Sequence, residues 1–481
     1  MGHVDNRVPV SSTTGLMSGN LYALLASRFP EDRSAPAFVL AGAGSISYGE
    51  IEAGVGRLAA LLRRKGVAPG DRVAAQAPKS FEAVMLYLAT LKLGAVHLPL
   101  NTAYTAAEIA YFVADAEPAL LATDAVALAA EAAGLEPLDA IHPAREQDLA
   151  AIVYTSGTTG RSKGAMLSHG ALAANGLALT TAWGFRRDDV LLHALPIYHV
   201  HGLFVAIHCV LLAGARMLWL ERFDVDQVIA GLARATVMMG VPTYYARLLA
   251  DPRFQSDAAA GMRLFISGSA PLLGSVFAEF EARTGQRLLE RYGMSEAAII
   301  TSNPLDGERL AGSVGYPLPG VELRLGAGGV VQIKGPSVTG GYWRNPARTA
   351  EAFTADGYFI TGDVGRQDPD GRLWLSGRTS DLIISGGLNV YPKEIELVLD
   401  ELAGVAESAV IGCPHPDFGE AVVAVIAGDG DEAAVIAAAR ARLAAFKAPK
   451  RVFFVADLPR NAMGKVLKAE LRRRYADAFG P

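Results

Sequence analysis

Cysteine is scarce in this chain, positive charge is not in excess, and no apolar run is both long and uninterrupted. Only two of the 481 residues are cysteines, Cys209 and Cys413, and they predict neither a disulfide framework nor a cysteine-based metal site. The net charge of −5 argues against a nucleic-acid-binding protein. His208 and Arg216 interrupt the longest apolar stretch, residues 202–220, which predicts a buried helix, a glycine break and a strand rather than a membrane span. Because the N-terminus also lacks a signal-peptide pattern, we expect a cytoplasmic protein that binds neither nucleic acid nor a membrane.

The length exceeds that of one ordinary core, so the chain should form more than one domain. Strand-like runs alternate with helical patterns from the start, as in residues 71–76, 81–92 and 95–100, and this predicts α/β layers with largely parallel sheets. The last hundred residues have a strand–helix–strand pattern of their own and a basic tail. We therefore predict a large N-terminal domain of layered α/β subdomains, residues 1–378, and a small α+β C-terminal domain, residues 379–481.

A loop rich in glycine, serine and threonine follows the apolar run at residues 150–153. Its glycines allow the backbone N–H groups to turn inward, and its hydroxyls and lysine can donate to phosphate oxygens. The spacing is not that of a Walker A loop, and the alternative to a polyphosphate loop is a flexible turn. The candidate phosphate-binding residues are Thr155, Ser156, Gly157, Thr158, Thr159, Gly160 and Lys163.

Further short motifs follow in order at residues 290–296, 358–363, 377–381, 385–392 and 459–465. In this order and spacing the chain resembles the acyl-adenylate-forming enzymes, which include acyl-CoA synthetases, luciferases and the adenylation domains of peptide synthetases. The resemblance extends from about residue 20 to the C-terminus. It implies that ATP converts a carboxylic acid into an acyl-adenylate with release of pyrophosphate, and that the thiol of coenzyme A then displaces AMP.

The resemblance implies roles for several polar residues. Lys465 would contact both the carboxylate and the α-phosphate, because two anions must approach each other. Glu296, with Thr158, would bind Mg²⁺ through oxygen. Asp363 would accept hydrogen bonds from the ribose hydroxyls, and Arg378 would donate to ribose or phosphate. The other implied ATP contacts are Ser269, Ala270, Pro271, Glu290, Arg291, Tyr292, Gly293, Met294 and Ser295.

In this family the small C-terminal domain rotates between the two half-reactions, which implies a hinge at Ser380. Gly386, Gly387 and Lys447 are the implied contacts of coenzyme A. Acetylation of Lys465 by a lysine acetyltransferase would remove its charge and stop adenylation. The sequence leaves the oligomeric state open.

The segments around the expected acid pocket resemble those of malonyl-CoA synthetases; they are residues 195–202, 241–249, 264–271 and 301–304. Pro242 suits a helix start, which puts Arg247 one turn into the helix. The resemblance implies that Arg247 pairs with the distal carboxylate of malonate and that Ser269 hydrogen-bonds it. His199 would close over the reacting carboxylate, and Met294 would also contact the acid. A small substituent, as in methylmalonate, is compatible with this interpretation.

Three alternatives stay open at this point. Arg247 could instead make a structural salt bridge, in which case the acid would be acetate, a medium-chain fatty acid or an aryl acid such as coumarate. The chain could be a catalytically weak module that only binds an adenylate. It could also load a carrier protein, although nothing resembling a carrier domain is appended.

Overall fold

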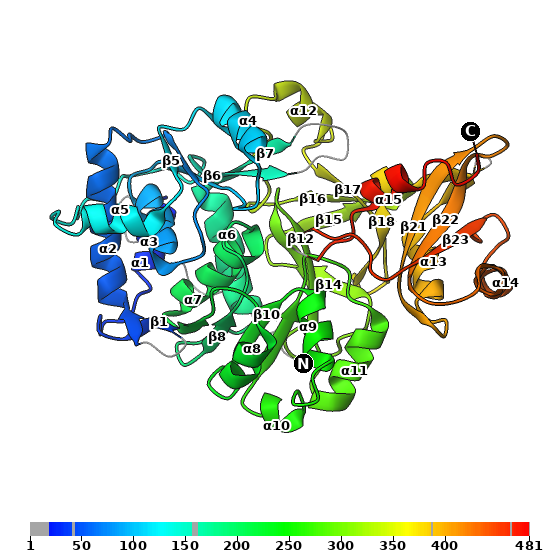
Figure 1. Ribbon diagram of the computed structural model, residues 1–481. Helices are drawn as coiled ribbons and strands as arrows, with labels where there is room; N and C mark the ends of the chain where they lie inside the picture. Colours follow the sequence, from blue (N-terminus) through cyan, green and yellow to red (C-terminus); the bar gives the residue numbers. More distant parts are fainter. Residues whose placement is uncertain (1–18, 41–43, 156–161, 386–387, 462–463, 481) are drawn as a thin grey trace, which may run out of the picture.

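The computed structural model describes residues 19–40, 44–155, 162–385, 388–461 and 464–480. A large lobe of layered sheets and helices carries a smaller lobe at one end, drawn in orange to red in Figure 1. Within the described ranges, no helix is both long and apolar enough to cross a membrane.

The first layer is a five-stranded sheet with the order β5-β3-β4-β6-β7. Its strands are β3 (Arg72–Ala75), β4 (Val96–Pro99), β5 (Leu120–Ala122), β6 (Leu149–Thr155) and β7 (Lys163–Ser168). They pair in parallel except β6 with β7, which form an antiparallel hairpin. The predicted phosphate loop is the connection of that hairpin, since β6 ends at Thr155 and β7 begins at Lys163.

The helix predicted at residues 81–92 is confirmed as α3 (Phe81–Lys92). It begins there because the Ser80 hydroxyl accepts a hydrogen bond from the amide of Ala83 and caps the first turn. It ends before Gly94, whose φ of 70° suits glycine. Further helices of the large lobe are α1 (Leu21–Ala26), α2 (Tyr48–Arg64), α4 (Ala106–Ala116), α5 (Ala125–Ala132), α6 (His169–Ala182), α8 (Val225–Leu232), α9 (Pro242–Leu249), α10 (Ser256–Ala259), α11 (Gly274–Thr284) and α12 (Pro346–Glu351).

A thirteen-stranded sheet forms the rest of the large lobe, with the order β15-β16-β17-β18-β14-β13-β12-β11-β10-β8-β9-β1-β2. Its parallel part consists of β1 (Pro36–Leu40), β8 (Val190–His193), β9 (Arg216–Trp219), β10 (Val237–Gly240), β11 (Leu264–Ser267) and β12 (Leu289–Met294), with β2 (Ser45–Ser47) antiparallel at the edge. The antiparallel part consists of β13 (Ala298–Ser302), β14 (Ser313–Pro317), β15 (Glu322–Leu325), β16 (Val330–Lys334), β17 (Phe359–Gln367) and β18 (Leu373–Arg378).

The expectation of largely parallel sheets is therefore wrong for residues 298–378. Several connections here are short, as between β15 and β16 or between β17 and β18. A parallel pair needs a crossover of a dozen or more residues, so these connections allow only antiparallel neighbours.

The apolar stretch at residues 202–220 forms a helix, a break and a strand, as predicted. A π-helical turn, η1 (His201–Ala206), runs into α7 (Ile207–Ala213), and Gly214 ends it with a φ of 63° before β9. The π-helical turn itself was not predicted. Such turns are rare and frequently occur at functional sites.

The smaller lobe has its own sheet and its own apolar core. Strand β22 (Gly419–Gly428) pairs with β21 (Val405–His415), β19 (Ile383–Ser385) and, in parallel, β23 (Arg451–Val455), while β20 (Leu388–Val390) pairs with β19. The helices are α13 (Pro392–Leu399), α14 (Glu432–Arg442) and α15 (Lys468–Arg474). Its core includes Ile395, Val410 and Ile426. An α+β lobe with a separate core can move as one body.

Candidate active site

A carboxylate and a guanidinium meet at the inner end of the β17–β18 hairpin. Asp363 on β17 lies opposite Arg378 on β18, and the Arg378 Nε donates to the Asp363 Oδ1 at 2.8 Å. The hydroxyl of Tyr292 on β12 donates to the second carboxylate oxygen. Asp363 is buried, so its carboxylate is held from two sides in one orientation. The remaining lone pairs of such a carboxylate can accept hydrogen bonds from vicinal hydroxyls such as those of a ribose.

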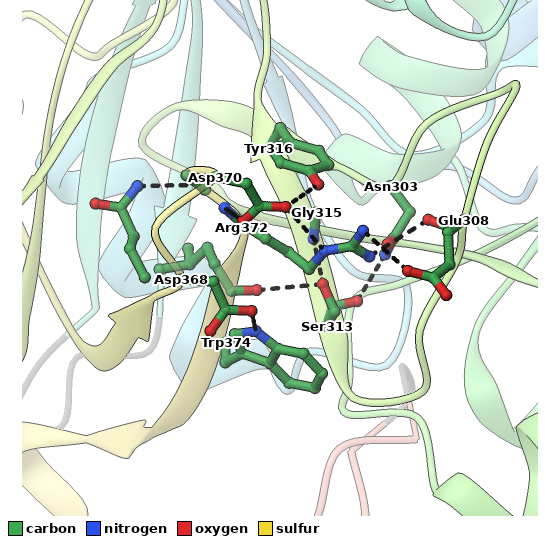
Figure 2. Close-up of polar contacts among 12 residues, drawn as sticks. Asn303, Glu308, Ser313, Gly315, Tyr316, Asp368, Asp370, Arg372 and Trp374 are labelled. Atoms are coloured by element: carbon green, nitrogen blue, oxygen red, sulfur yellow. Dashed lines mark hydrogen bonds and ion pairs between the residues drawn. The ribbon is translucent and has the colours of Figure 1, made fainter.

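A second polar cluster fixes the outer end of the same hairpin (Figure 2). The Tyr316 hydroxyl donates to Asp370 at 2.7 Å, and the buried Arg372 guanidinium donates to the Glu308 carbonyl at 3.3 Å. The side-chain amide of Asn303 donates to the Ser313 carbonyl at 2.6 Å and to the Glu290 carbonyl on β12 at 2.8 Å. The hairpin and β12 both bond to the segment of residues 303–312, which lies between β13 and β14. These bonds fix the position of the Asp363–Arg378 pair relative to β12.

Glu296 lies in the turn between β12 and β13 and is 7% exposed. Its Oε1 accepts a hydrogen bond of 3.1 Å from the Tyr342 hydroxyl, and burial raises its pKa. Among the residues that the structure describes, no three His, Cys, Asp or Glu side chains are grouped closely enough to hold a metal ion by themselves. One buried carboxylate still fits Mg²⁺ bound to a nucleotide, since this ion commonly uses one or two carboxylates and completes its shell with phosphate and water.

The phosphate-loop strand lies beside this turn. The Lys163 ammonium is 5.8 Å from the centre of the Tyr342 ring, and the amide of Trp343 donates to the Gly164 carbonyl at 2.8 Å. Thr155 faces Lys163 across the β6–β7 ladder. The residues predicted between them, Ser156, Gly157, Thr158, Thr159 and Gly160, lie outside the described part of the chain. The contacts of Tyr342 were not predicted. The sequence feature that could have indicated a functional residue here is the Gly-Gly-Tyr-Trp run that ends at Trp343.

A loop of the smaller lobe brings Lys465 to the Asp363–Arg378 pair. The Lys465 side chain as a whole is exposed, but its ammonium group is partly buried. This burial and the positive charge of Arg378 lower the pKa of Lys465, whereas the negative charges of Asp363 and Asp381 raise it. The neighbouring Gly464 packs so tightly on α9 that a Cβ atom would lie 2.9 Å from the Thr243 side chain. The two lobes therefore meet with a lysine beside the hairpin.

Ser380 is exposed and lies in the short η3 helix (Thr379–Asp381) that directly follows β18. The next residue, Asp381, forms a 2.8 Å ion pair with Arg472 on α15 of the smaller lobe. A change of backbone angles at Ser380 would thus turn Asp381 together with that lobe. Of the predicted coenzyme A contacts, Lys447 forms an ion pair with Glu394 in the same lobe, while Gly386 and Gly387 lie outside the described residues.

His199 precedes the π-helical turn and is half-buried, and its ring lies 4.7 Å from the ring of Tyr198. Burial lowers its pKa to about 4, so the imidazole is neutral at physiological pH. Arg247 lies on α9 where it was predicted, and its side chain is exposed. It makes no ion pair with any other residue in the described ranges.

Ser269 has a φ of 72°, a conformation that costs a residue other than glycine about 1–3 kcal/mol. Its hydroxyl lies 3.2 Å from the Nδ1 of His201, which is 3% exposed. The turn continues through the half-buried Ala270 to the exposed Pro271. Gly293, Met294 and Ser295 are half-buried at the end of β12, so the ends of β11 and β12 and the π-helical turn meet at one place.

These features define the class of protein. Residues 25–343 match the family described as AMP-binding enzyme, and residues 394–465 match the AMP-binding enzyme C-terminal domain. The first match covers more than half of the chain, and the chain therefore belongs to the AMP-binding enzymes, the adenylate-forming superfamily.

Three known proteins are similar to this chain. ATP-bound MatB from Rhodopseudomonas palustris is 49% identical with a TM-score of 0.94, over 96% of this chain and 100% of that one. A malonate–CoA ligase from Arabidopsis thaliana is 41% identical over 368 residues, which are 68% of this chain but only 60% of the plant protein. A malonyl-CoA ligase with methylmalonyl-CoA and AMP bound is 36% identical over 91% of this chain and 99% of that one, with a TM-score of 0.67.

The comparison also bears on how the lobes are arranged. The apo form of the same MatB has the same identity and coverage, but its TM-score is 0.83. The present arrangement is therefore more similar to the ATP-bound form than to the apo form. This agrees with the position of Lys465 beside the Asp363–Arg378 pair.

Proposed function

We propose that the protein is an AMP-forming acid–thiol ligase that joins malonate to coenzyme A through malonyl-AMP and releases AMP and pyrophosphate. The observation that carries the proposal is the closeness of Lys465 to the Asp363–Arg378 pair, whose charges act on the lysine, near the ends of β11 and β12. The likeness to the plant malonate–CoA ligase and to the structure holding methylmalonyl-CoA supports malonate, with methylmalonate as a second substrate.

In the first half-reaction, a carboxylate oxygen attacks the α-phosphate of ATP and the bond to pyrophosphate breaks. Lys465 stabilises the charge that develops where the two anions meet. Asp363 and Arg378 hold the ribose, and the loop from Thr155 to Lys163 holds the leaving phosphates. Ser295 donates to the α-phosphate. Mg²⁺, when bound through Glu296 and Thr158, neutralises phosphate charge.

In the second half-reaction, the smaller lobe rotates about Ser380 and withdraws Lys465. This requires the division of the chain into domains of residues 1–378 and 379–481. The thiol sulfur attacks the acyl carbon and AMP leaves. Gly386, Gly387 and Lys447 contact coenzyme A, for which Lys447 must exchange its partner Glu394. The neutral His199 shields the reacting carbonyl from water and then admits the thiol.

The distal carboxylate of malonate pairs with Arg247 and accepts a hydrogen bond from Ser269, with Met294 beside it. Malonate supplies a partner of opposite charge to Arg247, which has none among the described residues. Bidentate geometry makes arginine better suited than lysine to this task. Acetylation of Lys465 by a lysine acetyltransferase would remove its charge and silence adenylation.

The test is CoA-dependent formation of AMP with malonate, methylmalonate, succinate, acetate, octanoate and coumarate. We expect a strong preference for malonate, with activity on methylmalonate. Preference for acetate, octanoate or coumarate would keep the adenylation mechanism but overturn malonate as the acid. ATP binding without pyrophosphate exchange for any acid would overturn the enzymatic function itself.

A further inference from the structure

A guanidinium is buried beside the turn that carries Ser269, and two of its nitrogens have no hydrogen-bond partner among the described residues. Arg291 on β12 is 4% exposed, and its Nε and Nη2 make no hydrogen bond within the described residues. Burial lowers its pKa to about 9, which still leaves it protonated at physiological pH. Buried charges in proteins are normally paired, because desolvation of an isolated charge is costly.

No acidic residue in the described part of the chain pairs with this charge. The adjacent Glu290 points to the opposite face of β12, because successive side chains of a strand alternate. Its Oε1 accepts a hydrogen bond from the amide of Leu272, and burial raises its pKa to about 8, so it is neutral at physiological pH. Arg291 forms no salt bridge with any residue that the structure describes.

The guanidinium lies against the turn that carries Ser269. A Cβ atom on Gly268 would lie 2.5 Å from the Cζ of Arg291, so the guanidinium occupies the space that a side chain at residue 268 would need. The charge of Arg291 also acts on His201, the partner of Ser269, and adds to the burial that keeps this imidazole neutral. The Nε2 of His201, like the two arginine nitrogens, is buried without a hydrogen bond in the described chain.

Two side chains that are more than nine-tenths buried thus bring unpaired polar atoms to the strained turn at Ser269. Water could satisfy individual N–H groups, but it would leave the positive charge uncompensated. A carboxylate would compensate the charge and accept from both nitrogens of one edge of the guanidinium.

We propose that Arg291 is a specificity-determining residue that binds the carboxylate of the acid that is not activated. This rests on the proposed function and adds a buried determinant to the exposed Arg247. An acid with an uncharged group at that position leaves Arg291 unpaired, so the pocket rejects it. The residue thereby selects dicarboxylates rather than taking part in adenylation.

The experiment compares malonate with malonamate, in which an amide replaces the second carboxylate at nearly constant shape. The wild-type kcat/KM for thioester formation should be about a hundredfold higher for malonate. In Arg291→Met that value for malonate should fall about a hundredfold, while the value for malonamate changes less than about threefold. Arg291→Lys keeps the charge but loses the fork geometry, and it should lie between the two.

The matched control is Arg287→Met, which removes an exposed arginine just before β12 and should leave both values unchanged. An ATP-induced rise in melting temperature verifies that each variant is folded. A wild type that does not discriminate between the two acids, or a folded Arg291→Met that keeps the preference, would overturn the assignment. A wild type that uses neither acid but is active on coumarate or octanoate would instead overturn the proposed function.

Discussion

The nucleotide side of the site and the acid side differ in how far the hydrogen bonds of their buried polar groups are satisfied. On the nucleotide side, Asp363 is bound by Arg378 and Tyr292, and Glu296 accepts from Tyr342. On the acid side, the buried Arg291 and His201 keep nitrogen atoms without partners in the described chain. We infer that the nucleotide side is preorganised for a step common to every acid, whereas the acid side is completed only by a particular substrate.

The comparison predicts that damage on the two sides has different signatures. A change on the nucleotide side should lower activity with all acids by the same factor. A change on the acid side should alter the ratio between acids. The predictions below follow from this difference.

The largest effect is expected for Lys465→Ala, which removes the positive charge beside the nucleotide side. Pyrophosphate exchange should fall by about a hundredfold or more. Thioester formation from supplied malonyl-AMP should persist, because the lysine is withdrawn in that step. The control is Lys334→Ala, at an exposed lysine on β16. Equal loss in both half-reactions would contradict rotation of the smaller lobe.

Asp363→Ala should have the next largest effect. It removes the acceptor of the ribose hydroxyls and leaves Arg378 unpaired, so kcat/KM for ATP should fall about ten- to a hundredfold. The ratio of malonate to malonamate activity should stay constant, as in the control Asp356→Ala at an exposed ion pair. Steady-state kinetics with both acids check this, and a changed ratio would mean that the two sides are not independent.

Arg247→Ala should lower kcat/KM for malonate about tenfold, less than a change at Arg291, because solvent screens an exposed charge. The affinity for ATP should survive, since α9 carries none of the nucleotide contacts. Arg253→Ala, at an exposed arginine paired with Asp251, is the control. Unchanged malonate kinetics would remove Arg247 from the acid pocket.

The smallest effect concerns stability rather than activity. The folded Glu290 keeps its proton up to a pKa of about 8, whereas the unfolded chain loses it near the ordinary value of 4.5. Unfolding therefore releases a proton in this window, and the free energy of unfolding falls as pH rises from about 4.5 to 8.

Glu290→Gln should remove that fall and be more stable than the wild type by about 4 kcal/mol at pH 8, but by less than about 1 kcal/mol at pH 5. Urea unfolding at several pH values measures the difference. The exposed Glu279→Gln serves as the control. Parallel curves for Glu290→Gln and the wild type would show that this carboxyl is already ionised in the folded protein.

Local signals in the sequence were sufficient where the structure is local. The helix at residues 81–92 was predicted to the residue, and the structure shows that Ser80 caps its start and that Gly94 follows its end. The position of Arg247 on α9 followed from the helix start at Pro242. Short motifs likewise indicated the nucleotide-site residues by resemblance, but the sequence could not give their mutual distances.

What could not be predicted depends on contacts between distant segments. Tyr342 reaches Glu296 across 46 residues, and Tyr292 reaches Asp363 across 71. The resemblance implied Arg291 as an ATP contact, and only its burial against Gly268 directs attention to the acid instead. The antiparallel half of the large sheet was also missed, because the expectation for the first strands was extended to residues 298–378.

The most direct test of the difference between the two sides is a crystal structure with a non-hydrolysable analogue of malonyl-AMP. Our account predicts that the ribose hydroxyls contact Asp363 and that the free carboxylate lies within hydrogen-bonding distance of both Arg291 and Ser269. A free carboxylate directed to solvent or to Arg247 alone, with Arg291 still unpaired, would contradict it.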